Sequence, residues 1–250
     1  MLFVHNTTNH SGDRTLWAQL QNRMQGYMSR RLPCVVHGTP QREALRSSGA
    51  DRIQQVALPG TGIAERHASA EPAVPPELSG IAGQDFLLCL GEIRANKGFH
   101  VAVEAARAAD RRLVVAGGAH DADYLQRLKD ESSDRVLILP RFLEPEEFSW
   151  LLDETSALVL PYQGFSAQSG PLARAMSLSK RVLISDNPAL MDQVQAYPLA
   201  TIVGASDRPS WAAAMRATPA GPPTKKSMHD TDDGPSWTAV ADAVRTAARS

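Results

Sequence analysis

The chain has few cysteines, no long apolar run and no excess of charge of either sign. Cys34 and Cys89 are the only cysteines among 250 residues, too few for a disulfide framework or a cysteine-rich zinc site, so we expect a reducing compartment, the cytoplasm. No apolar stretch approaches the length of a membrane span, and the start of the chain lacks the basic and apolar regions of a signal peptide. The 26 basic residues balance 27 acidic ones, which disfavours a nucleic-acid partner.

Catalytic and metal-binding motifs are also scarce. The histidines are scattered without the spacing of metal ligands, so we expect no metal site. No Gly-x-Ser-x-Gly elbow is present, and no Gly-x-Gly-x-x-Gly follows an apolar strand. A serine hydrolase and a dinucleotide-binding enzyme therefore lack their usual signatures.

What the chain does contain is a regular alternation of short apolar segments and helical segments from residue 86 onward. This alternation is typical of a doubly wound parallel α/β sheet. The expected strands cover residues 86–90, 113–116, 136–139, 157–160, 182–184 and 201–203. The expected helices cover residues 99–109, 122–131, 145–154, 171–179, 187–196 and 209–217.

The part of the chain before residue 86 follows the same pattern less completely. Strands are expected at residues 1–4, 33–36 and 51–58, and helices at 15–31 and 41–48. Composition then shifts to Ala, Pro, Glu and Ser, which is typical of a linker. We therefore divide the chain into a first domain (1–62), a linker (63–84), a second domain (85–217), a flexible loop (218–235) and a closing helix (236–250).

Ligands of parallel α/β sheets bind outside the carboxyl ends of the strands, so the residues that follow each strand are the site candidates. After the strand at 86–90, Gly91 permits close backbone approach, and Arg94 and Lys97 bring two cations to one turn. The strand at 157–160 leads into a loop that opens a helix, and a helix N-terminus attracts anions. These features together favour a diphosphate ligand, with Gly117, Gln168, Ser169 and Gly170 as further contacts. Two plainer interpretations stay open: a solvated loop pair for the two cations, and an ordinary βαβ unit with nothing bound.

Several of these stretches, taken as an ensemble, resemble the family 4 glycosyltransferases. FLLCLGEIRANKGFHVAVEAA is similar to the strand, Gly-x-Ile-Arg-x-x-Lys-Gly loop and helix of that family. RLVVAGG, RVLILPRFLEPEEFSWLLDETSALVLPY and a Ser-Gly helix follow in the family's order, and FVHNTTNHSG resembles the acceptor-domain loop of some members. The resemblance implies a GT-B-like α/β fold, with a partial N-terminal and a complete C-terminal Rossmann-like domain.

The resemblance also implies roles for single residues. Arg94 and Lys97 would hold the diphosphate of a nucleotide-sugar donor, and the Ser169–Gly170 turn would bind phosphate through backbone N–H groups. Phe142 and Leu143 would flank the nucleobase, and His5 would face the reacting sugar or the acceptor from across the cleft. Transfer would proceed with retention of configuration and without a metal or cofactor, to a saccharide, lipid or small-molecule acceptor.

Two departures from the family keep alternatives open. Ser166 and Arg174 occupy the positions where many members carry glutamates, although a subset with a Ser-Gly loop lacks those acids and resembles this chain best. Several strands that the family has before the His-Asn loop are missing, so a partner chain could complete the first domain. Peripheral membrane association is a further possibility that we keep open. The alternatives to an active transferase are a degenerate relative that binds a nucleotide sugar or a partner without turnover, and another phosphate-binding α/β enzyme such as an epimerase.

Overall fold

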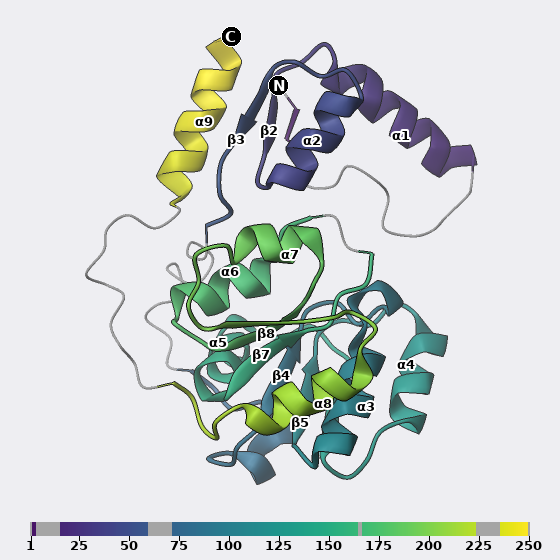
Figure 1. The fold of residues 1–250 in the computed structure, drawn as a ribbon, viewed down its shortest axis with the longest axis vertical. Helices are drawn as coiled ribbons and strands as arrows, with labels where there is room; N and C mark the ends of the chain where they lie inside the picture. The colour runs from purple at the N-terminus through teal and green to yellow at the C-terminus, as the bar shows by residue number, and fades with distance from the viewer. Residues whose placement is uncertain (1, 4–15, 60–71, 165–166, 224–235, 250) are drawn as a thin grey trace.

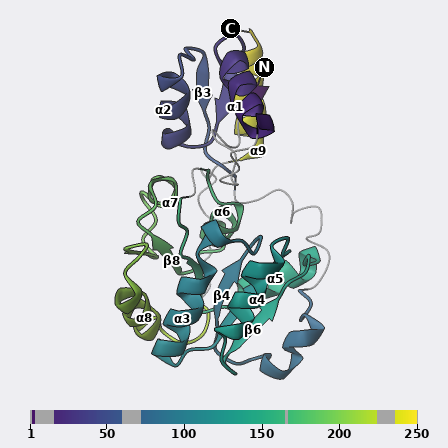
Figure 2. The ribbon, with the colours of Figure 1, turned by 90° about the vertical axis from the view of Figure 1, so that its right-hand side faces the viewer.

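The protein, described here by a computed structural model, contains two parallel sheets that lie one above the other along the long axis of the molecule (Figures 1 and 2). The structure describes residues 2–3, 16–59, 72–164, 167–223 and 236–249, and for residues 2–3, 16–22 and 249 it describes the backbone only. His5 and Ser166 lie outside the described residues.

The larger sheet has six parallel strands in the order β6-β5-β4-β7-β8-β9. From β4, the sheet extends through β5 to β6 on one side and through β7 and β8 to β9 on the other, which is the doubly wound arrangement, and the predicted α/β class is confirmed. The strands are β4 (Leu87–Leu90), β5 (Leu113–Ala116), β6 (Val136–Leu139), β7 (Ala157–Leu160), β8 (Val182–Ser185) and β9 (Ala200–Val203).

The helices that cover this sheet begin with recognisable capping residues. Four N-cap side chains each accept a hydrogen bond from a backbone N–H of the first turn: Asp121, Ser169, Asn187 and Asp207. Proline lies in the first turn of the helices that begin at residues 145, 170, 188 and 208. The elements are η3 (Ala95–Lys97), α3 (Phe99–Ala109), α4 (Ala122–Asp130), α5 (Pro145–Glu154), α6 (Gly170–Ser177), α7 (Pro188–Gln193) and α8 (Arg208–Ala217).

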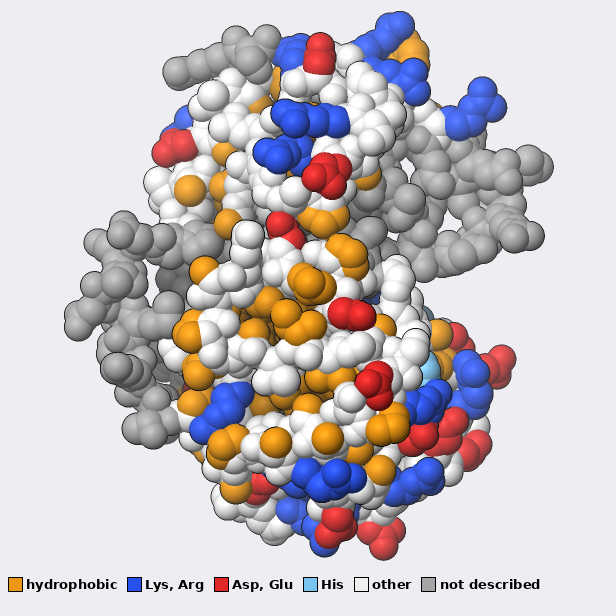
Figure 3. Space-filling view, in the orientation of Figure 1, with side chains coloured by type: hydrophobic (Ala, Val, Ile, Leu, Met, Phe, Trp, Pro, Cys, Tyr) orange, Lys and Arg blue, Asp and Glu red, His pale blue; other side chains and the backbone are white. Residues whose placement is uncertain are grey.

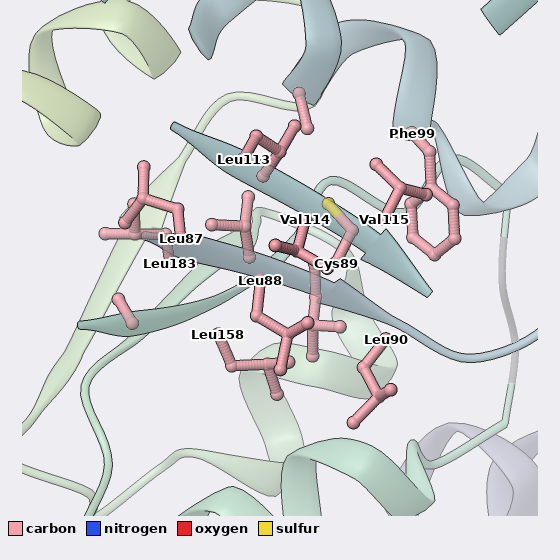
Figure 4. Packing of buried hydrophobic residues seen from close by; sticks show 14 of the residues in the cluster. Leu87, Leu88, Cys89, Leu90, Phe99, Leu113, Val114, Val115, Leu158 and Leu183 are labelled. Atoms are coloured by element: carbon pink, nitrogen blue, oxygen red, sulfur yellow. The ribbon is translucent and has the colours of Figure 1, made fainter. Parts of the chain in front are cut away.

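The main hydrophobic core lies on both faces of this sheet. Every residue of β4, β5, β7 and β8 is buried, which explains why these strands are continuous apolar runs and do not alternate with polar residues. Figure 4 shows the side chains of β4 and β5 projecting to both sides of the sheet, with Phe99 of α3 packed beside Val115.

The smaller sheet has three parallel strands in the order β1-β2-β3 and a separate small core made of Cys34, Val36, Leu45 and Ala50. Its elements are β1 (Leu2–Phe3), α1 (Leu16–Ser29), β2 (Cys34–Val36), α2 (Thr39–Ser47) and β3 (Ile53–Gln55). The last helix, α9 (Trp237–Arg249), returns from the far end of the chain to pack beside β2 and β3 (Figure 1).

The structure differs from the sequence expectations mainly between residues 51 and 84. The strand expected over 51–58 is limited to Ile53–Gln55. The second half of the expected linker contains a 3-10 helix, η2 (Pro76–Ile81), whose Leu78 is fully buried in the main core and whose Glu77 pairs with Arg141. These residues therefore belong to the larger unit, whereas residues 60–71 of the expected linker and 224–235 of the expected loop lie outside the described residues.

Within the described parts of the chain, two hydrogen bonds join the smaller and the larger units. The Thr39 N–H at the start of α2 donates to the Asp192 carboxylate of α7 at 3.1 Å, and the Leu58 N–H donates to Gln168 Oε1 at 3.3 Å. On the face seen in Figure 3, basic and acidic side chains are mixed at both ends of the molecule, as the balanced composition predicts. Among the described helices, none combines the length and apolar character needed to span a bilayer.

Candidate donor-binding site

The candidate site lies at the carboxyl ends of β4 and β7, where the strand order of the larger sheet reverses. The loops that leave these two adjacent strands turn toward opposite faces of the sheet, and ligands of this architecture bind at that point. The first loop runs from Gly91 to η3, and the second runs from Pro161 to the start of α6. A Cβ atom added at Gly91 would lie 3.8 Å from Pro171 Cγ, so the first loop adjoins the first turn of α6.

Two glycines allow backbone segments to meet at this edge. Gly98 has φ +66°, and a Cβ there would overlap the Pro161 carbonyl oxygen and lie 3.2 Å from Gln163 Cγ. Beside this contact, the Gln163 N–H donates to the Asn96 carbonyl at 2.8 Å. Gly117 has φ +143°, and a Cβ there would lie 2.6 Å from the carbonyl carbon of Gly91. Both positions therefore require glycine for backbone geometry, whatever they bind.

Lys97 is buried at the centre of this region, with 6% of its surface exposed. Its Nζ lies 3.8 Å from the centroid of the Tyr162 ring, a favourable arrangement for a cation. Burial, and to a smaller extent the nearby Arg94 guanidinium, lowers the pKa of Lys97 from 10.5 to about 7, while Glu92 acts in the opposite direction. A dianionic ligand placed here would favour the protonated amine and would restore the full charge.

Arg94 immediately precedes the 3-10 helix η3 and is more exposed than Lys97. Its Nη1 is 3.3 Å from the Glu92 carboxylate, a partly exposed ion pair that contributes little to stability. Its buried Nε, and both side-chain polar atoms of Asn96, have no hydrogen-bond partner among the described residues. Buried polar atoms in this state are expected to meet a ligand or water.

The N-terminus of α6 supplies a second anion-attracting element. Ser169 is 2% exposed, and its Oγ accepts a hydrogen bond from the Leu172 N–H at 3.4 Å. The Ser169 N–H is used by Gln193 Oε1, and the Gln193 Nε2 donates to the Ser169 carbonyl, both at 2.9 Å. Pro171 has no N–H, so within this turn the Gly170 N–H is the backbone donor for which the structure describes no partner. The turn therefore offers a ligand fewer backbone donors than the sequence suggested. A Cβ at Gly170 would meet open space.

The remaining predicted residues are less closely associated. Phe142 and Leu143 follow β6, two strands from β4 at the same edge; Phe142 is 86% exposed and Leu143 is buried. Arg141 fixes this loop through paired hydrogen bonds to Glu77 and Glu147, and it lowers the pKa of Glu77 to about 2. Gln168 hydrogen-bonds to the smaller unit, as described above.

Three residues at this site were not anticipated from sequence: Tyr162, Asn96 and Gln193. Tyr162 and Asn96 lie in loops that follow strand ends, so their positions in the sequence could have marked both as candidate site residues. Gln193 lies at the end of α7, and its contact with Ser169 depends on tertiary packing that no local pattern encodes. Among the described residues, no group of three or more His, Cys, Asp or Glu side chains is suited to a metal ion.

Comparison with known families identifies the family of the larger unit. The family model of the glycosyl transferases group 1 matches residues 84–218, more than half of the chain. The chain belongs to the group 1 glycosyl transferases. The matched segment contains every strand of the larger sheet and both loops of the candidate site.

Solved structures share the fold at low sequence identity. AviGT4, a glycosyltransferase involved in avilamycin A biosynthesis, is 22% identical with a TM-score of 0.56, over 75% of this chain and 54% of its own. HepE from Anabaena in complex with UDP and glucose is 14% identical with a TM-score of 0.64, over 99% of this chain and 66% of its own. A UDP-forming α,α-trehalose-phosphate synthase from Burkholderia xenovorans is 12% identical with a TM-score of 0.64, over 86% and 59%.

These likenesses establish a GT-B-type glycosyltransferase fold for this group 1 member. The chain spans between about half and two thirds of the length of these structural relatives. No curated protein matches the sequence at a significant level.

Proposed function

We propose that this chain carries the donor-binding site of a glycosyltransferase that moves a sugar from a nucleoside-diphosphate sugar to a saccharide, lipid or small-molecule acceptor. The observation that carries the proposal is the meeting of Arg94, Lys97 and the α6 N-terminus at the strand-order reversal of the larger sheet. Family membership supports the reaction class, and HepE, solved with UDP and glucose, supports a nucleotide-sugar donor.

The chemistry follows from where charge develops. As the bond between the sugar C1 and the diphosphate oxygen breaks, negative charge accumulates on the departing nucleoside diphosphate, while the acceptor oxygen bonds to C1 and its hydroxyl proton is released. Two cations and a helix N-terminus that already lie beside the departing diphosphate oxygen stabilise its negative charge without a divalent metal. The proposed reaction retains the configuration at C1, and the proposed donor complex has His5 facing the reacting sugar and Phe142 against the nucleobase.

A binding protein without turnover is the second candidate. The observation that favours it is Arg174, which lies in α6 where many relatives of this type carry a glutamate and which cannot accept hydrogen bonds from sugar hydroxyls. Such a protein would keep the diphosphate contacts of Arg94 and Lys97 and lack the chemical step.

The test is acceptor-dependent release of nucleoside diphosphate from UDP-, GDP- and ADP-sugars, with EDTA present and an acceptor mixture of mono- and disaccharides and glycolipids. Release that is lost in Lys97→Met and kept in Lys129→Met, a control at an exposed lysine of α4, supports the transferase. Binding of UDP, GDP or ADP without release favours the binding protein. Interconversion of the nucleotide sugar without acceptor, or release that requires a divalent metal, contradicts the proposal.

A further inference from the structure

Tyr162 is buried between the two elements that the proposed function assigns to the diphosphate. It follows β7 after Pro161, none of its surface is exposed, and its backbone carbonyl accepts a hydrogen bond from Ser185 Oγ at 2.7 Å. A tyrosine anchored in this way at the end of a central strand has little freedom to move, so groups that contact its ring and hydroxyl are held in fixed positions.

The two ends of the Tyr162 side chain contact the two anion-attracting elements. The face of the ring lies 3.8 Å from the Nζ of Lys97, which comes from the loop after β4. The hydroxyl lies 3.2 Å from Ser169 Oγ, and Ser169 is the N-cap residue of α6. One side chain therefore connects the buried cation to the helix N-terminus.

We propose that Tyr162 is a positioning residue for diphosphate binding: its ring supports the charged form of Lys97, and its hydroxyl aligns the Ser169 cap of α6 with that cation. The proposal rests on the proposed function, because it assigns both elements to the same diphosphate. Tyr162 itself is too deeply buried to be a ligand contact.

The electrostatic surroundings give the ring its importance. Among the described residues, Arg94 disfavours the ammonium form of Lys97 and Glu92 favours it, and burial outweighs both effects. An aromatic face is a stabilising partner for a desolvated ammonium that adds no counter-charge to repel a diphosphate. Burial raises the pKa of Tyr162 well above its ordinary value, so its hydroxyl stays protonated and able to hydrogen-bond with Ser169 across the pH range of a binding assay.

The experiment compares Tyr162→Phe, Tyr162→Leu and the control Tyr197→Phe. Tyr197 donates its hydroxyl to the Lys180 carbonyl away from the site, so its variant loses a comparable hydrogen bond without touching the proposed elements. For each variant, the affinity for UDP, or for GDP or ADP where the wild-type protein binds that nucleotide instead, is measured by calorimetry between pH 7 and 9. The pKa of Lys97 is measured without ligand by NMR of protein labelled at the Cε atoms of its five lysines. The Lys97 signal is assigned with Lys97→Met.

We expect Tyr162→Phe to leave the pKa of Lys97 unchanged and to weaken UDP binding about fivefold, because only the link to Ser169 is lost. Tyr162→Leu should lower the pKa of Lys97 further and weaken UDP binding about tenfold or more. Tyr197→Phe should change neither quantity.

The proposal is overturned if folded Tyr162→Leu keeps the wild-type pKa of Lys97, or if both Tyr162 variants bind UDP as Tyr197→Phe does, since Tyr162 would then be a packing residue only. Failure of the wild-type protein to bind any of UDP, GDP and ADP would refute the proposed function instead. In that case an unchanged pKa of Lys97 in Tyr162→Leu would still overturn the role of the ring, and a lowered pKa would support it.

Discussion

Gly117→Ala tests the claim that the carboxyl edge of the larger sheet depends on close backbone contact. The added Cβ would lie 2.6 Å from the Gly91 carbonyl carbon and 3.3 Å from Gly91 Cα, where ordinary contacts begin near 3.4 Å. These neighbours are backbone atoms at the end of a central strand, so they cannot rotate away as a side chain would.

The magnitude has two parts. The φ of +143° suits glycine, and a strained backbone costs other residues about 1–3 kcal/mol. Forcing a methyl group into a filled space costs about 1–3 kcal/mol more. The expected loss of about 2–6 kcal/mol is a large share of the roughly 5–15 kcal/mol that stabilises a typical domain.

The matched control is the neighbouring Gly118→Ala. No atom lies within 4 Å of a Cβ at Gly118, and its φ lies outside the strained range, so the expected change is below about 0.5 kcal/mol. Urea unfolding followed by circular dichroism measures both variants. Equal midpoints for the two variants would refute the steric argument, and with it the close approach of the Gly91 and Gly117 loops.

Three further predictions concern charge, ligand stacking and the contact between the two units. Lys97→Met should raise the free energy of unfolding at pH 7 by about 1–2 kcal/mol, because a buried amine is removed. Since the pKa of Lys97 is lowered from 10.5 to about 7, the folded protein binds fewer protons than the unfolded chain in that window, so wild-type stability rises with pH. The advantage of the variant should therefore shrink between pH 7 and 9 in urea titrations, and a constant difference would contradict the lowered pKa. Phe142→Ala should leave the thermal midpoint unchanged because its side chain is 86% exposed, yet weaken UDP binding about tenfold in calorimetry; unchanged affinity would remove Phe142 from the nucleobase site. Asp192→Ala should speed amide hydrogen exchange at Thr39. An exchange rate at Thr39 that is the same in the variant as in the wild-type protein would show that this carboxylate does not cap α2 in solution.

The larger sheet could be predicted from sequence because its strands are buried on both faces. Continuous apolar runs such as Leu87–Leu90 and Ala157–Leu160, separated by helices of which α4 and α5 carry a proline or an acid in the first turn, have few alternative arrangements. The position of Arg94 and Lys97 at a strand end followed from the same pattern, since the carboxyl ends of parallel strands share one edge.

The contacts that define the site in detail could not be predicted, because they join residues far apart in the chain. Gln193 reaches Ser169 from a different helix, and Tyr162 meets Lys97 from a different strand end. The helix η2 was mistaken for linker because Pro76, Glu77 and Ser79 are typical of linkers, while the single buried Leu78 that anchors it gives no periodic signal.

The most direct test of the central claim is calorimetric titration of the wild-type protein, Lys97→Met and Lys129→Met with UDP, GDP and ADP in the absence of metal. We expect the wild-type protein and Lys129→Met to bind one of the three nucleotides, with equal affinity. We expect Lys97→Met to bind that nucleotide at least about tenfold more weakly while remaining at least as stable. Equal affinity in Lys97→Met and Lys129→Met, or no binding by the folded wild-type protein, would contradict a diphosphate site at the carboxyl ends of β4 and β7.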